Sequence, residues 1–212
     1  MEPIHSIIQS ALESYNRLFS VNASSEMNSE LLKIEANLNQ IDITNTLSEE
    51  HQYIVGSLMM ETYFVYNQLG GPWLGLIPSF RDAFDAAYLH TKNLCTAPGP
   101  SSLVDALYYL ILSTAFISDD SKRKEHFETF QHRVEVIDPQ IREFLRLVGI
   151  CLYWGSFVDP NMDDLKKIDF SKVDTQWNSV KQFWKPLHHS FWHSLAHITH
   201  DIAQIAGQET TI

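Results

Sequence analysis

Cysteine is scarce in this sequence, and so are the signals that direct a chain out of the cell. The 212 residues include only two cysteines, Cys95 and Cys151, and both have apolar neighbours. A free cysteine in such surroundings is more often a small buried hydrophobe than a disulfide partner or nucleophile, which favours a reducing compartment. The amino-terminal segment lacks the positive charge and continuous apolar stretch of a signal peptide, and no apolar run reaches the roughly 20 residues that cross a bilayer. We therefore expect a soluble, cytoplasmic protein without a membrane segment.

Basic residues are also few. Lysine and arginine total 15 against 26 aspartates and glutamates, which gives a formal net charge of −11. The one basic run, residues 122–124, follows Asp119 and Asp120 after a single serine. A nucleic-acid backbone requires a basic stripe, so nucleic acid is not an expected partner. We interpret the basic run as a solvated part of the first turns of an outer helix.

Strand patterns and internal repeats are missing as well. Apolar residues instead recur at spacings of three and four along most of the chain, which predicts amphipathic helices and an all-α fold. With 44% hydrophobic residues the chain has ample material for a buried core. We predict one all-helical domain over residues 1–212, a globular bundle of about eight to ten helices. A helical hairpin over residues 3–41 is expected to pack on residues 48–207.

Three segments are apolar on most sides, which predicts three buried central helices. They cover residues 57–66, 103–117 and 141–155. Ser48 and the Asp119–Asp120 pair are placed to cap the helices that follow them. Ser102 and Asp105 resemble a capping box that opens the second apolar segment, and the helix dipole then accounts for Asp105.

Glu61 is the one acidic residue within the first apolar segment. A buried carboxylate is costly unless it is paired, protonated or bound to something. Either a structural hydrogen bond to a tyrosine or histidine holds it, or it is a pocket acid or metal ligand.

The strongest chemical signal is a helix predicted over residues 186–207, which carries five of the ten histidines. At about 100° per residue, one side of this helix is histidine-rich and the other is apolar. The histidine side holds His189, His193, His197 and His200. The apolar side holds Leu187, Phe191, Leu195, Ile198, Ile202 and Ile205.

Three interpretations of this histidine row stay open: a metal or acid–base site, a pH-responsive contact surface, and a plain solvated face. For a metal, His193, His197, His200 and Asp201 supply four donors within about two turns. Ligands in one row cannot surround an ion, so another element must contribute a ligand. Glu61 is the first candidate, and the others are His51, His90, His126 and His132.

A second feature is the apolar loop over residues 70–78, which contains Trp73, Leu74 and Leu76. Such a loop folds over the core, or it forms a ligand lid or a partner-docking patch. Four aromatic residues could line a ligand pocket: Tyr108, Tyr109, Tyr153 and Trp154. Aromatic residues at these spacings more often belong to the core.

Catalytic and nucleotide-binding motifs are missing, including phosphate-binding loops, nucleophile elbows and His-Glu-x-x-His. The sequence therefore favours a non-enzymatic α-helical binding or regulatory protein that contacts a protein or small ligand and needs no cofactor. Its expected contact residues are Trp73, Leu74, Leu76 and His189. The alternative is a metal-dependent helical-bundle enzyme, oxidative or hydrolytic, that uses iron, manganese or zinc on the histidine-rich helix. Oligomeric state stays open.

Overall fold

The computed structural model describes residues 4–21, 24–42, 44, 47–68, 78–115, 119–155, 166–170, 197, 199–205 and 207. Within this part the chain is helical and contains no strand, which confirms the predicted all-α fold. The labelled helices of this described part are α1 (Ile4–Leu18), α2 (Ser24–Leu38), α3 (Glu49–Gln68), α4 (Pro78–Leu94), α5 (Pro98–Ala115), α6 (Asp120–Val134) and α7 (Pro139–Gly155). None of the described helices is long and apolar enough to cross a membrane.

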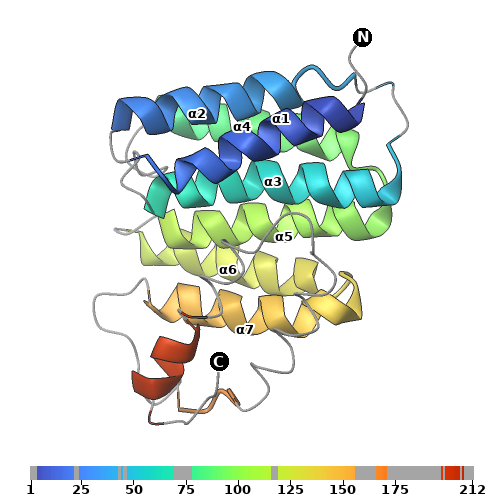
Figure 1. The fold of residues 1–212 in the computed structure, drawn as a ribbon. Helices are drawn as coiled ribbons and strands as arrows, with labels where there is room; N and C mark the ends of the chain where they lie inside the picture. The colour runs from blue at the N-terminus through green and yellow to red at the C-terminus, as the bar shows by residue number, and fades with distance from the viewer. Residues whose placement is uncertain are drawn as a thin grey trace.

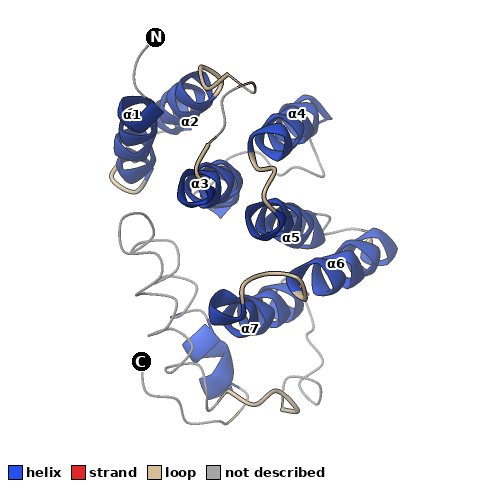
Figure 2. Ribbon diagram, turned by 90° about the vertical axis from the view of Figure 1, so that its right-hand side faces the viewer, coloured by secondary structure: helices blue, strands red, loops and turns tan. Residues whose placement is uncertain are grey.

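The helices lie side by side and stack in a regular order (Figures 1 and 2). The α1–α2 pair forms one edge, α3 and α5 occupy the middle, and α6 and α7 follow at the other edge. Helix α3 packs against α1, α2, α4 and α5, while α5 packs against α3, α4, α6 and α7. This position explains why both helices are apolar on most sides, since neighbours cover them nearly all round.

Two of the predicted helix caps are present. The Ser48 hydroxyl accepts the His51 amide at 3.2 Å, and the Asp119 carboxylate accepts the Lys122 amide at 3.1 Å. Each oxygen satisfies an amide that has no partner within the first turn of its helix.

The predicted capping box is wrong, because α5 begins at Pro98 and Ser102 already lies inside the helix. The backbone amide of Ser101 donates to the Ala97 carbonyl at 3.0 Å, which closes the first turn ahead of the predicted start. Proline is tolerated there, since first-turn amides have no helical acceptor and the proline ring fixes a helical φ.

The basic run at the start of α6 also departs from the prediction, because Arg123 is buried and only 2% exposed. Its Nε donates to the Ser113 carbonyl at 3.3 Å, and its guanidinium lies 3.7 Å from Asp120. Ser113 belongs to the last turn of α5, where carbonyls lack helical partners and a cation is favoured by the dipole. Lys122 and Lys124 are exposed as predicted.

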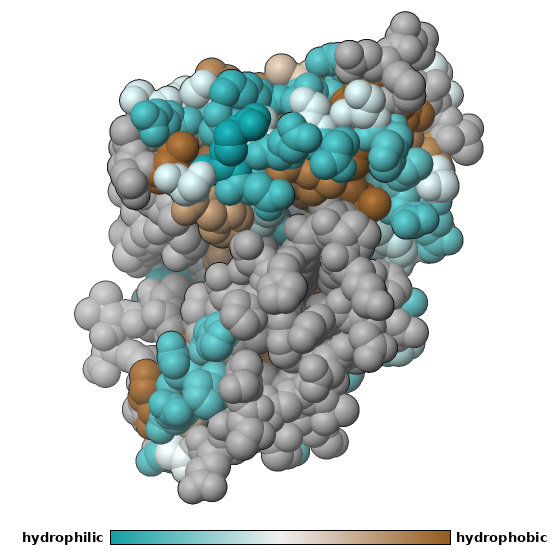
Figure 3. All heavy atoms as spheres, viewed as in Figure 1, coloured by the Kyte–Doolittle hydropathy of each residue, from teal (hydrophilic) through white to brown (hydrophobic). Residues whose placement is uncertain are grey.

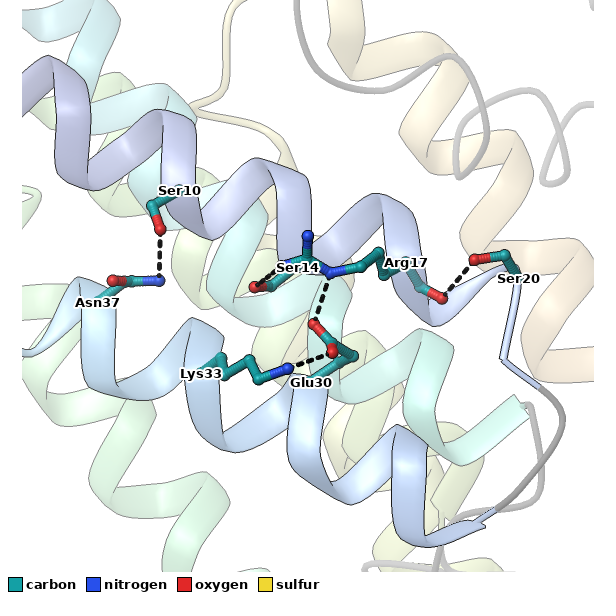
Figure 4. A network of polar contacts seen from close by, with 7 residues as sticks. All are labelled: Ser10, Ser14, Arg17, Ser20, Glu30, Lys33 and Asn37. Carbon is teal, nitrogen blue, oxygen red and sulfur yellow. Dashed lines mark hydrogen bonds and ion pairs between the residues drawn. The ribbon is translucent and has the colours of Figure 1, made fainter.

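The α1–α2 hairpin is held by polar contacts between its helices (Figure 4). Glu30 on α2 is the centre: Arg17 Nε lies 3.0 Å from its Oε2 and Lys33 Nζ lies 2.5 Å from its Oε1. Ser10 and Asn37 form a second link at 3.2 Å. The surface over this hairpin is mostly hydrophilic, with smaller hydrophobic areas between (Figure 3). The basic side chain of α2 is thus directed toward α1.

The helical residues 199–205 pack against α7 through Thr199 and Ala203, both buried. Thr199 hydrogen-bonds the thiol of Cys151, and burial raises the pKa of that thiol to about 12. Cys95 is buried too, and neither cysteine forms a disulfide, as expected. Ile205 is 68% exposed, so its predicted place on the packing face is wrong.

Candidate functional site

The predicted metal ligands that the structure describes do not converge. His197 and Asp201 are exposed, and His200 is half-buried with its Nε2 2.9 Å from the Gln204 amide nitrogen. Among the described residues, no three histidine, cysteine, aspartate or glutamate side chains are grouped so that they could hold a metal ion. His193 and His189 lie outside those residues, so a site that includes His193 stays a prediction.

Glu61 is completely buried in α3 and accepts two hydroxyl groups. Tyr15 of α1 donates to its Oε2 at 3.2 Å, and Ser57 donates to its Oε1 from one turn earlier. Burial, followed by the nearby Glu61, raises the pKa of Tyr15 well above its ordinary value, so Tyr15 remains a donor. The predicted structural hydrogen bond to a tyrosine is therefore present, and it joins α1 to α3.

The other candidate histidines have individual roles. His90 Nε2 lies 3.4 Å from the Leu38 carbonyl oxygen and must carry the proton, because a carbonyl only accepts. His126 is half-buried beside Tyr109, and burial, followed by Arg81, lowers its pKa. His51 is half-buried at the start of α3, and His132 is exposed.

The metal prediction has a direct test. We expect tag-free protein to contain no stoichiometric metal, and His197→Ala to leave stability nearly unchanged because His197 is exposed. Elemental analysis and denaturant unfolding check both points. A near-stoichiometric ion that His197→Ala removes would instead support the metal-dependent enzyme.

The predicted contact residues Trp73, Leu74 and Leu76 also lie outside the described residues. The four aromatic candidates belong to or border the core, as their commoner use predicts. Tyr108 stacks on Tyr88 with ring centroids 3.9 Å apart, and Tyr153 stacks on Phe127 at 4.0 Å.

A polar network that sequence reasoning missed lies between α4, α5 and α6. Asp105 is 7% exposed and lies well inside α5, which begins at Pro98, so the helix-dipole explanation of this residue is wrong. Lys92 Nζ lies 2.8 Å from its Oδ1, Tyr88 donates to the same oxygen at 2.8 Å, and Arg133 Nε approaches Oδ2 at 3.8 Å. Burial, followed by the bond to Asp105, raises the pKa of Tyr88, which keeps it a donor. These groups satisfy one another, so the network fixes the helices rather than offering reactive groups.

On the other side of α4 from this network, a groove separates α4 from α2. We call it the α2–α4 groove, and its volume is about 230 Å³. Its lining consists of Glu35 of α2, Asn39 directly after the end of α2, Met59 of α3, and Ala83, Ala86 and Ala87 of α4. Both flanking helices pack on α3, which forms the floor (Figure 2). The groove exists because α4 presents only methyl groups where larger side chains would fill the space.

A buried tyrosine holds the Glu35 side chain that lines the α2–α4 groove. Tyr63 of α3 is fully buried, contacts the rings of Phe80 and Phe84 on α4, and donates its hydroxyl to Glu35 Oε1. Burial, followed by the hydrogen bond to Glu35, raises the pKa of Tyr63, so this donor keeps its proton. Glu35 is therefore held in a fixed orientation at the edge of the groove.

Charge is unevenly distributed around the α2–α4 groove. Lys33 of α2 is directed to Glu30 on the α1 side (Figure 4). On α4, Arg81 pairs with Asp85 at 2.8 Å and Lys92 pairs with Asp105, both on the α5 side. The lining itself contains a carboxylate and no basic side chain. The basic residues of both flanking helices thus face away from the groove.

Ala83 is exposed and lines the groove, although its spacing along α4 is that of the buried residues Phe84 and Ala87. No protein-family model matches the chain, and comparison with curated proteins and with solved structures finds no match either. The geometry of the groove is therefore the basis for a functional assignment.

Proposed function

We propose that this chain is a non-enzymatic α-helical binding protein and that the α2–α4 groove receives a side chain from a segment of a protein partner. The groove itself carries the proposal: it is preformed, lined by small apolar and two polar side chains, and held by a buried tyrosine. The anchor residues that dominate protein interfaces commonly fill pockets on the partner surface.

The size of the groove favours a protein anchor over a whole small ligand. Its volume of about 230 Å³ falls below the roughly 300 to 1,000 Å³ typical of small-molecule sites. A single large side chain is closer to this volume, and the rest of a partner segment would then lie on the surrounding surface.

That surrounding surface offers apolar contacts. Leu32 of α2 is 63% exposed and Leu89 of α4 is 61% exposed. Leu32 lies on the same helical face as Glu35 and Asn39, and Leu89 follows Ala86 by one turn. A segment that crosses the groove would bury both leucines, which favours binding by about 25 cal/mol per Å² of apolar surface removed from water.

Filling the groove should abolish this binding. Ala86 is exposed, so Ala86→Phe adds a ring to the lining while leaving the core intact. The matched control is Ala36→Phe, which places the same ring at an exposed position of α2 outside the lining. Peptides selected from a random display library on the full chain should lose affinity for Ala86→Phe by roughly tenfold or more, and keep it for Ala36→Phe.

Peptides that bind both variants as well as the unchanged chain would show that the groove is not the binding site and would overturn the proposal. The protein-partner proposal would also be overturned if the selection yields no peptide and a small molecule binds the unchanged chain but not Ala86→Phe. The occupant of the groove would then be a small ligand.

A further inference from the structure

We infer that the side chain received by the α2–α4 groove is a cation, and specifically the guanidinium of an arginine in the partner segment. This inference rests on the proposed function and adds the chemistry of the anchor. Its basis is the combination of a fixed carboxylate, a neighbouring amide and an aliphatic wall within one groove.

Only one oxygen of the Glu35 carboxylate accepts a hydrogen bond from a described residue. Glu35 Oε1 accepts the Tyr63 hydroxyl, while no described residue donates to Oε2 or forms an ion pair with it. Because Tyr63 keeps its proton, it can donate but cannot neutralise Glu35. An incoming N–H group would therefore find an oriented acceptor, and a charged donor forms the stronger hydrogen bond.

Among the residues that the structure describes, no cation is positioned to supply that donor. Lys33, Arg81 and Lys92, on the two flanking helices, each pair with a carboxylate on a side away from the groove. The nearby His90 directs its Nε2 to the Leu38 carbonyl. With a net charge of −11 for the whole chain, the field around the groove favours approach of a positive group.

The shape of the groove selects arginine over lysine. Asn39 follows Glu35 by four residues, so its side-chain carbonyl lies on the same face of α2. The planar guanidinium presents several N–H groups in a fork that can meet both acceptors, whereas an ammonium acts as a point charge. The alanine methyls and Met59 would contact the aliphatic stem of the arginine.

A matched pair of small probes tests the charge. The full chain, labelled with ¹³C at its alanine methyls, is titrated with N-acetyl-argininamide and, separately, with N-acetyl-citrullinamide, which has nearly the same shape but no charge. The arginine probe should shift the methyl signals of Ala83, Ala86 and Ala87 with a Kd on the order of millimolar. The citrulline probe should shift them at least roughly tenfold more weakly.

Two variants complete the experiment. Glu35→Gln keeps an oxygen that can accept from Tyr63 but removes the charge, and it should abolish the preference for arginine over citrulline. Ala86→Phe should block both probes without changing the charge. Equal binding of both probes, an arginine preference that survives Glu35→Gln, or no methyl shift with the arginine probe would overturn this inference.

The outcomes also separate the inference from the proposed function. Display peptides that require an open groove but lack arginine, and that bind Glu35→Gln normally, would leave the proposed function standing and remove the cationic anchor. Peptides that ignore Ala86→Phe would remove both.

Discussion

Asp105→Ala should lower the free energy of unfolding by about 3 kcal/mol, among the largest losses expected from one substitution in this chain. Asp105 is nearly buried and accepts both Lys92 and Tyr88 at 2.8 Å. Removing the carboxylate leaves the Tyr88 phenol without its acceptor, and it leaves the partly buried Lys92 ammonium with only the neutral oxygens of Ser101. Breaking a buried pair in this way costs more than the pair itself contributes, because the remaining charge is uncompensated.

Denaturant unfolding measures this loss, with two variants for comparison. Asp105→Asn keeps an acceptor for Tyr88 and removes only the charge opposite Lys92, so its loss should be smaller. Asp82→Ala removes an exposed carboxylate from α4 and should change stability by no more than about 0.5 kcal/mol. A loss below about 1 kcal/mol for Asp105→Ala would contradict the assigned role of the network.

The network also matters for the α2–α4 groove. Tyr88 and Lys92 attach one face of α4 to α5, which sets the position of the opposite face where Ala83 and Ala86 line the groove. The shape of the groove therefore depends on the polar contacts between α4 and α5, which lie on the side of α4 that faces away from the groove.

Much of the fold could be predicted from local patterns in the sequence. Apolar spacing identifies the helices, and cap residues such as Ser48 and Asp119 act on amides two or three residues away. Both signals involve residues close together in the sequence, so they can be recognised without knowledge of the tertiary structure. The start of α5 was missed because proline at a first turn can equally mark a break.

The errors concern residues whose environment comes from another helix. Arg123 is buried because the end of α5 supplies a carbonyl, and Asp105 is buried because Tyr88 and Lys92 reach it from α4. A charge pattern along one helix contains no information about such partners. The prediction for Ile205 is wrong for the same reason, because the side of a helix that becomes buried depends on the surface against which the helix packs.

The groove could not be predicted for a related reason. Its walls, α2 and α4, are separated by α3 in sequence and meet only because both pack on that helix. Ala83 and Ala86 look like ordinary helix residues in the sequence. Their small side chains leave an open space only because Glu35 and Asn39 lie on the opposite wall. Glu61, in contrast, could be singled out by sequence, since an acid within an apolar helix requires a partner.

Glu61→Ala should also destabilise the chain by about 3 kcal/mol, through two orphaned donors rather than an orphaned charge. Tyr15 and Ser57 both donate to this carboxylate in the fully buried interface between α1 and α3. Without it their hydroxyls remain buried and unsatisfied. Glu61→Gln retains one acceptor and should lose less, and Glu13→Ala, an exposed change on α1, should lose almost nothing.

A double-mutant cycle with Tyr15→Phe separates the structural role of Glu61 from a role as metal ligand. If the hydrogen bond between α1 and α3 is the function of Glu61, the two substitutions should couple by about 1 kcal/mol in metal-free protein. The coupling should be the same with and without a chelator. Coupling that appears only when metal is present, or a loss of stability that added metal reverses, would assign Glu61 to a metal site and favour the enzyme over the binding protein.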